Sequence, residues 1–331
     1  MDNMVLREID FHITNRCNMN CIHCLYDSGK KTIEEMGLDD IKRVIKDFSI
    51  ISNRRGSLNL FGGEIFVRRD VFSIIETLKE EGLRLGIITN GSFGETIFNK
   101  IAECKPARLT IDLDGASKDT HDWLRNKDGS FKKSINTIRR FIKNKVKIAV
   151  TTALNKKNVE EIEKILELCN ILGIYSISFF MMTPLGRGEN LKEYVLNGNE
   201  WIKTKKRVQN WVANNKPRFS ITWENAFLEK DQLSLQKMLC NNFYGDVLNI
   251  KCNGDVYFCG LLASQDKGKI GNVRHESLRE IIMKANTETL NMKSCFALKF
   301  NGSENKEVLT HNVIAGCPYN IEQLNIRREV S

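Results

Sequence analysis

The sequence lacks most of the features that mark secreted, membrane-spanning or disordered proteins. Only four of its 331 residues are proline, and no low-complexity segment interrupts it, which leaves little room for a long disordered linker. No apolar run is long enough to span a bilayer. The first ten residues, MDNMVLREID, have no apolar core of the kind that a signal peptide needs. We therefore expect a globular protein of the cytoplasm without a membrane partner.

The ten cysteines are best explained by metal or redox chemistry. In a chain without an export signal, clustered thiols indicate such chemistry more than disulfides. The formal charge is +9, but lysine and arginine are spread along predicted helices such as 136–147 and 203–207. This spread favours a solvated surface over a nucleic-acid patch. We expect no nucleic-acid partner.

Strand-like and helix-like patterns alternate through the first 185 residues. β-Branched and apolar runs predict strands at 8–14, 57–61, 84–89, 108–113, 147–153 and 176–181. Apolar residues at three- and four-residue intervals predict helices at 39–51, 69–81, 93–103, 130–143 and 158–172. Six strand–helix units fall short of the eight that close a full barrel. The pattern therefore predicts an α/β fold, a partial (β/α)6 TIM barrel, over residues 1–189.

Two further segments follow the predicted barrel. Residues 190–236 are more polar and helical in pattern, with Trp201, Trp211 and Trp223 spaced along them, and we interpret them as a helical bridge. Residues 237–331 hold the remaining cysteine cluster and begin a second, small domain. Within it, VLNIKCNGDVYFCG predicts a β-hairpin that turns at Asn253-Gly254.

The most informative motif lies directly after the first predicted strand. Cys17, Cys21 and Cys24 are spaced C-x3-C-x2-C, and thiolates are soft ligands that suit an iron–sulfur cluster or zinc. A four-iron cube on three cysteines leaves one iron open to a molecule with an amine and a carboxylate. A structural zinc site with His12 or His23 as fourth ligand is the alternative.

This spacing resembles the signature of the radical S-adenosylmethionine (radical SAM) superfamily, and residues 61–66 and 240–259 resemble its SPASM/Twitch branch. The resemblance implies a partial barrel, a [4Fe–4S] cluster on Cys17, Cys21 and Cys24, and S-adenosylmethionine (SAM) at its open iron. It further implies reductive cleavage of SAM to a 5′-deoxyadenosyl radical that abstracts hydrogen from a substrate. An electron donor such as flavodoxin or ferredoxin would supply the electron.

Two loops after strands are candidates for binding SAM, and the first of them matches the family's site for the SAM amino group. In FGGEIF, glycines let the backbone come close to a ligand and a carboxylate follows; the resemblance implies that Gly62, Gly63 and Glu64 bind the amino group of SAM. Thr89 and Asn90, after the third strand, offer a hydroxyl and an amide for the ribose. The loop 184–187 is a further candidate, for the adenine.

The stretch IDLDGASKDTHDWLR resembles a SPASM-enzyme segment in which Ser-x-Asp-Gly precedes His-Asp and Arg. Here Asp112 stands where serine is usual, so Arg125 becomes the candidate for the SAM carboxylate. The alternative is that His121, Asp122 and Arg125 only stabilise a loop and a helix entrance through capping and ion pairs.

The C-terminal cysteines predict a second metal centre. Cys240, Cys259, Cys295 and Cys317 supply the four thiolates that close an iron–sulfur cluster, with structural zinc as the alternative. The C-x2-C-x5-C-x3-C block of a full SPASM domain is missing, so we expect a single auxiliary cluster. Together with the SAM cluster this makes two [4Fe–4S] clusters. Cys252 is a candidate ligand in place of Cys240, a candidate hydrogen-atom donor, or a packed small hydrophobe.

The branch resemblance predicts a ribosomally synthesised peptide as substrate, changed by epimerisation, crosslinking or oxidation. No extra N-terminal domain for a leader peptide is evident, so the barrel, the auxiliary domain or a separate protein would hold the peptide. The alternatives are a dehydrogenase or epimerase of a small molecule such as an aminoglycoside, and a non-enzymatic zinc or iron–sulfur scaffold.

Overall fold

The computed structural model describes residues 6–30, 32–224, 227–229, 246–289 and 313–315. Its contacts divide the chain into two compact units. The first takes its described residues from Met1–Asn20, Leu25–Thr110 and Asn241–Met292, and the second from Cys21–Cys24, Ile111–Cys240 and Lys293–Ser331. The cysteine loop is therefore shared: Cys17 belongs to the first unit, and Cys21 and Cys24 belong to the second.

In the first unit, the central strand β1 has a parallel neighbour on each of its two edges. β1 (Glu8–Thr14) pairs in parallel with β2 (Ser57–Gly62), and β2 pairs in parallel with β3 (Arg84–Thr89). On its other edge β1 pairs in parallel with β9 (Val247–Ile250), which comes from the C-terminal part of the chain. The strands β10 (Asp255–Tyr257) and β11 (Gly271–Asn272) follow β9 as antiparallel neighbours.

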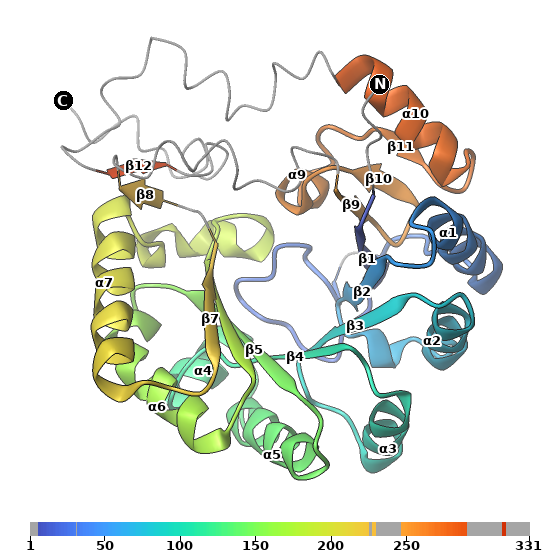
Figure 1. Cartoon of the computed structure of the whole chain (residues 1–331). Helices are drawn as coiled ribbons and strands as arrows, with labels where there is room; N and C mark the ends of the chain where they lie inside the picture. Colours follow the sequence, from blue (N-terminus) through green and yellow to red (C-terminus); the bar gives the residue numbers. More distant parts are fainter. Residues whose placement is uncertain (1–5, 31, 225–226, 230–245, 290–312, 316–331) are drawn as a thin grey trace. The chain divides into compact units, whose positions relative to one another are not determined.

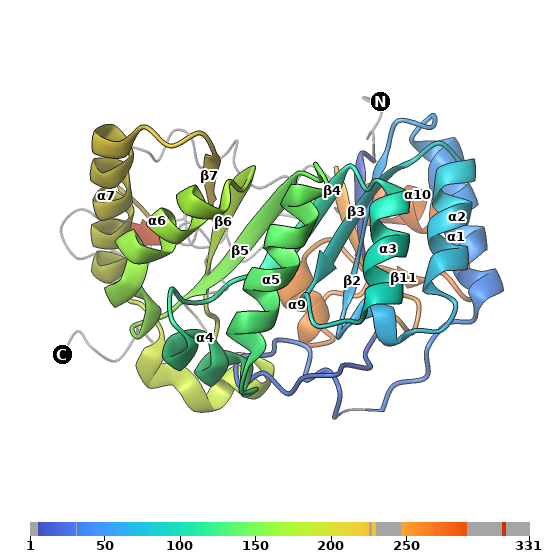
Figure 2. The ribbon, with the colours of Figure 1, turned by 90° about the horizontal axis from the view of Figure 1, so that it is seen from below.

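Helices cover one side of β1, β2 and β3 (Figures 1 and 2). The helices of the first unit are α1 (Leu38–Ile51), η1 (Ile65–Val67), α2 (Val71–Glu80), α3 (Glu95–Cys104), α9 (Gly260–Ser264) and α10 (Leu278–Thr289). Alternate residues of β1, Ile9, Phe11 and Ile13, are completely buried, as is Phe48 of α1. Burial of each such side chain stabilises the fold by about 1.5–3 kcal/mol, so this layer forms the core of the unit.

The second unit repeats the arrangement. β5 (Ile148–Leu154), β6 (Ser176–Met181) and β7 (Ser220–Trp223) pair in parallel and in that order, and β8 (Phe227–Glu229) pairs antiparallel with β12 (Val313–Ala315). The strand β4 (Arg108–Asp112) begins in the first unit and ends in the second. The helices are α4 (Lys118–Arg125), α5 (Ser130–Lys143), η2 (Asn158–Glu161), α6 (Ile162–Leu172), η3 (Gly186–Tyr194) and α7 (Gly198–Asn215). Figure 1 labels α4, α5, α6 and α7.

The predicted α/β fold and its strand–helix alternation are confirmed. β1, β3, β6 and α5 have the predicted ends, and the other predicted strands and helices differ by a few residues. The predicted hairpin is also confirmed: β9 and β10 are antiparallel, and Gly254 adopts φ +92° at the turn, a left-handed conformation that glycine adopts without steric cost.

The interpretation of residues 190–236 as a helical bridge is wrong for residues 220–223 and 227–229, which form the strands β7 and β8. The first stretch, Ser-Ile-Thr-Trp, extends the parallel pairing of β6. β-Branched side chains favour a strand here, and the Ser178 hydroxyl lies 2.7 Å from the Thr222 hydroxyl on the neighbouring strand. The domain boundaries at 189/190 and 236/237 stay predictions. No described helix has the length and apolar character to cross a membrane.

Candidate SAM and iron–sulfur site

In the first unit, the Gly-Gly-Glu turn after β2 lies against the start of the cysteine loop. The Gly63 amide donates to the Thr14 carbonyl and the Glu64 amide to the Arg16 carbonyl, both at 2.9 Å. A Cβ on Gly63 would lie 2.2 Å from the Arg16 carbonyl oxygen and 2.9 Å from the Cys17 Cβ. Only glycine permits this close approach, because any side chain at position 63 would collide with the backbone that carries Cys17.

Glu64, Thr89 and Asn90 form one hydrogen-bonded group. One Glu64 carboxylate oxygen accepts from the Phe66 amide at 3.3 Å. The other oxygen accepts from the Thr89 hydroxyl at 2.8 Å and from the Asn90 amide at 3.0 Å. All three side chains are buried. The carboxylate therefore joins the ends of β2 and β3, and the roles of these residues toward SAM stay predictions.

Asn18 and the pair Glu35–Arg68 also fix this loop, and sequence analysis did not single them out. The Asn90 side-chain amide donates to the Asn18 side-chain oxygen at 2.9 Å. Glu35 accepts from the Thr14 hydroxyl at 2.7 Å, and the buried Arg68 donates to the Ile13 carbonyl at 2.8 Å. These partners are distant in sequence and follow no motif, so no local signal could have identified them.

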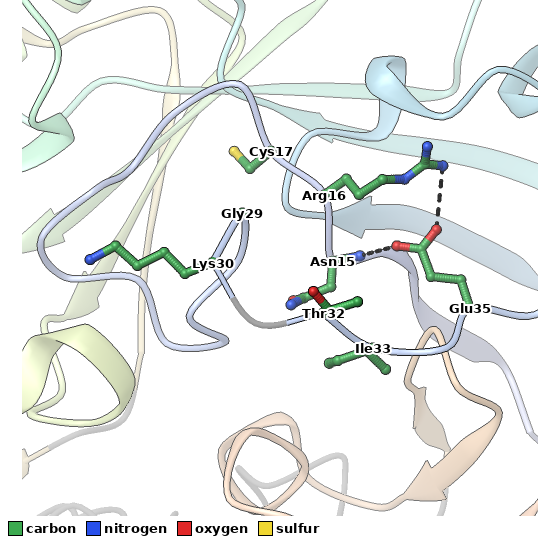
Figure 3. A pocket seen from close by; sticks show the side chains of 8 residues that line it. All are labelled: Asn15, Arg16, Cys17, Gly29, Lys30, Thr32, Ile33 and Glu35. Atoms are coloured by element: carbon green, nitrogen blue, oxygen red, sulfur yellow. Dashed lines mark hydrogen bonds and ion pairs between the residues drawn. The ribbon is translucent and has the colours of Figure 1, made fainter.

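A pocket of about 470 Å³ opens beside Cys17 within the first unit (Figure 3). Figure 3 shows the Arg16 side chain turned toward Glu35, whose carboxylate lies 3.4 Å from the guanidinium, while the Cys17 thiol points the other way. The volume of this pocket is in the range of small-molecule sites. Its lining residues are Asn15, Arg16, Cys17, Gly29, Lys30, Thr32, Ile33 and Glu35.

In the second unit, the segment after β6, at the start of η3, and the end of α4 hold the other two cysteines. The Arg187 side chain donates to the Cys21 carbonyl at 2.7 Å, and its amide donates to the Cys24 carbonyl at 3.1 Å. The amide of Ile22 donates to the Leu124 carbonyl at 3.1 Å. The segment 184–187, a candidate for contacting adenine, thus supports the cysteine loop through Arg187; its role toward adenine stays a prediction.

Arg125 lies between two carboxylates and a cysteine. Its Nη1 is 2.9 Å from Asp112 Oδ2 and 3.9 Å from Cys21 Sγ, and its Nε donates to Asp114 Oδ2 at 2.6 Å. Burial raises the pKa of the Cys21 thiol, although the Arg125 charge opposes that shift. The guanidinium is therefore already ion-paired in this structure, and its contact with the SAM carboxylate stays a prediction.

Asp122 performs the capping role considered for this segment. Its carboxylate accepts from the Gly129 amide, the Ser130 hydroxyl and the Phe131 amide, each at 2.7 Å. These bonds satisfy free donors at the start of α5. They lower the pKa of Asp122 against the opposing effect of its partial burial. The neighbouring His121 accepts the Asp114 amide at 3.1 Å through Nδ1, which also makes it a structural residue.

The described sulfurs have surroundings that suit an anionic cluster. Besides the Arg125 contact to Cys21, the Met19 amide donates to Cys17 Sγ at 3.4 Å, and such donors stabilise thiolates that ligate iron. No three His, Cys, Asp or Glu side chains among the described residues are grouped to hold a single metal ion. The cluster on Cys17, Cys21 and Cys24 and the zinc alternative therefore both stay predictions.

Of the two histidines named for zinc, His12 is buried and His23 is partly exposed, and both have lowered pKa values. Burial and then the Lys251 charge lower the pKa of His12 to about 3, and its ring stacks on Tyr26 with centroids 4.6 Å apart. Burial and then the Arg125 charge lower the pKa of His23 to about 4, and its Nδ1 lies 3.2 Å from the Leu124 carbonyl.

Two C-terminal cysteines can be placed. Cys259 is half-buried and precedes α9, and Cys252 is completely buried between β9 and β10. Burial and then the Glu35 charge raise the pKa of the Cys252 thiol to about 11. Cys240, Cys295 and Cys317 lie outside the described residues, so the predicted four-cysteine ligand set stays a prediction.

Comparison with known families identifies two segments of the sequence. Residues 11–169 match the radical SAM superfamily, and residues 240–307 match the SPASM iron–sulfur cluster-binding domain. The chain carries a radical SAM domain followed by a SPASM domain. The predicted resemblance to the radical SAM superfamily and its SPASM branch is therefore confirmed, and the two domains support an enzyme that uses iron–sulfur clusters and SAM.

Relatives of this radical SAM enzyme have diverse names. An AdoMet-dependent heme synthase of Methanosarcina barkeri is 28% identical over 294 residues, 83% of this chain and 81% of that protein. The subtilosin biosynthesis protein AlbA of Bacillus subtilis is 24% identical over 183 residues, 55% of this chain and 40% of its own.

Solved structures show the same fold. Streptococcus suis SuiB bound to S-adenosylmethionine superposes with a TM-score of 0.72 and 15% identity, over 88% of this chain and 71% of SuiB. SuiB bound to its precursor peptide SuiA gives a TM-score of 0.69 and 14% identity, over 83% of this chain and 64% of SuiB.

Proposed function

We propose that this radical SAM enzyme modifies a ribosomally synthesised peptide by abstracting hydrogen from an unactivated carbon. Epimerisation, crosslinking and oxidation are the outcomes that such an abstraction allows. The proposal is supported by the combination of a radical SAM domain with a SPASM domain, and by relatives named for peptide products or solved with a precursor peptide.

One observation carries the assignment of the reaction site. The Gly-Gly-Glu turn is bonded to the backbone that leads into Cys17, through the Gly63 and Glu64 amides. When bound, the cluster and SAM supply a 5′-deoxyadenosyl radical, and Cys17, Cys21 and Cys24 would hold that cluster. Glu64 fixes the loop after β3 by accepting from Thr89 and Asn90. These residues position the loops, which favours reaction in one orientation.

The electron for this chemistry would come from an external protein, a flavodoxin or a ferredoxin. A second cluster, on Cys240, Cys259, Cys295 and Cys317, would pass electrons to or from the substrate, so that the enzyme holds two [4Fe–4S] clusters. We propose the cytoplasm as its location, since its thiols require a reducing compartment.

The substrate proposal is tested with the product of any short open reading frame beside this gene. The peptide, SAM and a reductant are incubated with the enzyme in deuterated buffer, and the peptide is analysed by mass spectrometry. We expect a peptide that has gained deuterium, as in epimerisation, or lost hydrogen, as in crosslinking or oxidation. An unchanged peptide, with SAM cleavage intact, would remove that peptide as substrate.

A small-molecule substrate is the second candidate. The relative named as a heme synthase aligns over 83% of this chain, more than AlbA does, which favours a substrate other than a peptide. A dehydrogenase or epimerase of an aminoglycoside-like alcohol belongs to the same class. Tritium or deuterium transfer from a labelled substrate into 5′-deoxyadenosine distinguishes the candidates, because only the true substrate donates its label.

Cys252 is our candidate for the hydrogen-atom donor in an epimerisation. Its raised pKa keeps the thiol protonated at neutral pH, as a hydrogen donor requires. Donation would leave a sulfur radical, which one electron from the flavodoxin or ferredoxin and one proton would restore. In the Cys252→Ala variant we expect 5′-deoxyadenosine to form while solvent deuterium no longer enters the peptide. A Cys104→Ala variant, altered on α3, serves as control; epimerisation by both variants at the wild-type rate would exclude Cys252 as donor.

A further inference from the structure

The second unit contains a buried charged group whose position the proposed reaction does not yet explain. Arg125 and Asp114 have side chains that are 9% and 1% exposed, and that of Asp112 is 19% exposed. One guanidinium faces two carboxylates, and Cys21 Sγ lies 3.9 Å from Nη1 of the same guanidinium. We define these four residues, Cys21, Asp112, Asp114 and Arg125, as the Arg125 group.

We propose that Arg125 is a positioning residue for the cluster thiolate itself: Asp112 and Asp114 hold its guanidinium against Cys21, where it sets the reduction potential of the SAM cluster. This inference rests on the proposed function, because it requires the cluster on Cys17, Cys21 and Cys24. It assigns Arg125 a role that operates before SAM binds.

The geometry fixes the guanidinium in one orientation. Nε and Nη2 both face Asp114, with 2.6 Å between Nε and Oδ2, and Nη1 donates to Asp112 at 2.9 Å. Asp114 is itself held, since its Oδ1 accepts from the Ala153 amide of β5 at 2.8 Å. Because the guanidinium is planar, these contacts determine where the remaining Nη1 hydrogen points, and Cys21 Sγ is the acceptor within reach.

Charge gives this contact an effect on the cluster. Hydrogen bonds to cluster sulfurs and nearby charge are among the factors that set a reduction potential. A guanidinium beside Cys21 favours the reduced, more negative cluster, whereas each aspartate opposes it. Asp112 places a second carboxylate on Arg125, 2.9 Å from Nη1. The potential is therefore expected to respond in opposite directions to removal of the arginine and of Asp112.

The test is a redox titration of anaerobically reconstituted, SAM-free protein, followed by electron paramagnetic resonance. We expect the midpoint potential of the SAM cluster to shift to a more negative value in Arg125→Gln and to a more positive value in Asp112→Asn. Arg125→Lys, which keeps the charge but not the planar fork, should restore part of the shift. The signal of the auxiliary cluster is identified in the Cys17/Cys21/Cys24→Ala variant and subtracted.

A matched control comes from another ion pair in the same unit. Arg207 donates two hydrogen bonds to Glu163, at 2.8 and 2.6 Å, between α7 and α6, and Arg207→Gln should leave the potential unchanged.

If Arg125 serves only the SAM carboxylate, its variants will lose SAM affinity while the SAM-free potential stays at the wild-type value, which overturns the inference. If the wild type assembles no cluster on the three cysteines, the proposed function fails instead. If Arg125→Gln does not retain a cluster, Asp112→Asn tests the inference alone. A more positive midpoint potential in Asp112→Asn supports it, and an unchanged or more negative potential overturns it.

Discussion

A Cys17/Cys21/Cys24→Ala variant is expected to form no detectable 5′-deoxyadenosine while it retains roughly half of the wild-type iron and sulfide. The reason is that three thiolates of one loop would hold the SAM cluster, whereas a separate set of C-terminal cysteines would hold the auxiliary cluster. Iron, sulfide and 5′-deoxyadenosine are measured on anaerobically reconstituted protein with SAM and dithionite. The predicted loss of SAM cleavage is complete because the three substitutions remove all three thiolates of the loop, and thiolates are the ligands that hold such a cluster.

The control for this experiment is Cys104→Ala, because Cys104 is half-buried at the end of α3 and belongs to neither predicted ligand set. It should keep both the iron content and SAM cleavage. If the triple variant loses all its iron, the prediction of an auxiliary cluster is wrong. If the wild type binds zinc without iron or sulfide, the zinc scaffold replaces the radical SAM hypothesis, and the enzymatic proposals for this chain fail together.

The fold was predictable where the sequence pattern is local. Alternation and β-branched runs gave the ends of β1 and β6 correctly, because strand periodicity depends on adjacent residues. The pairing of β9 with β1 was not predictable, because it joins segments from opposite parts of the chain. The same holds for β7: four residues with a strand composition were too short a signal beside the long helix α7.

The site was predictable as a set of motifs but not as a network. The spacing of Cys17, Cys21 and Cys24 and the Gly-Gly-Glu turn were evident from residue types alone. The sequence could not show that the Glu64 carboxylate accepts from both Thr89 and Asn90. Which partner satisfies a buried polar group depends on the tertiary fold, since such groups are almost always paired. Family motifs therefore locate the loops, and only the structure shows what each side chain contacts.

Gly63→Ala is expected to lower kcat/KM for SAM cleavage roughly tenfold to a hundredfold. An alanine methyl group at this position would lie 2.2 Å from the Arg16 carbonyl oxygen and 2.7 Å from its carbonyl carbon. Overpacking of this kind costs about 1–3 kcal/mol, and each 1.4 kcal/mol is about a factor of ten in rate. Since both neighbours are backbone atoms, the clash can be relieved only by shifting the segment that carries Cys17.

Two further measurements on Gly63→Ala show how the shift of this segment acts. Iron content reports whether Cys17 still helps to hold the cluster, and equilibrium binding of SAM reports whether the turn still accepts the ligand. Because the methyl group pushes directly on the residue before Cys17, we expect iron content and SAM affinity to fall together. The control is Gly94→Ala, at the start of α3, where φ is −85° and no atom lies within 4 Å of the added Cβ. Wild-type iron content and SAM affinity in Gly63→Ala would show that the close approach of the two loops is not required for the site.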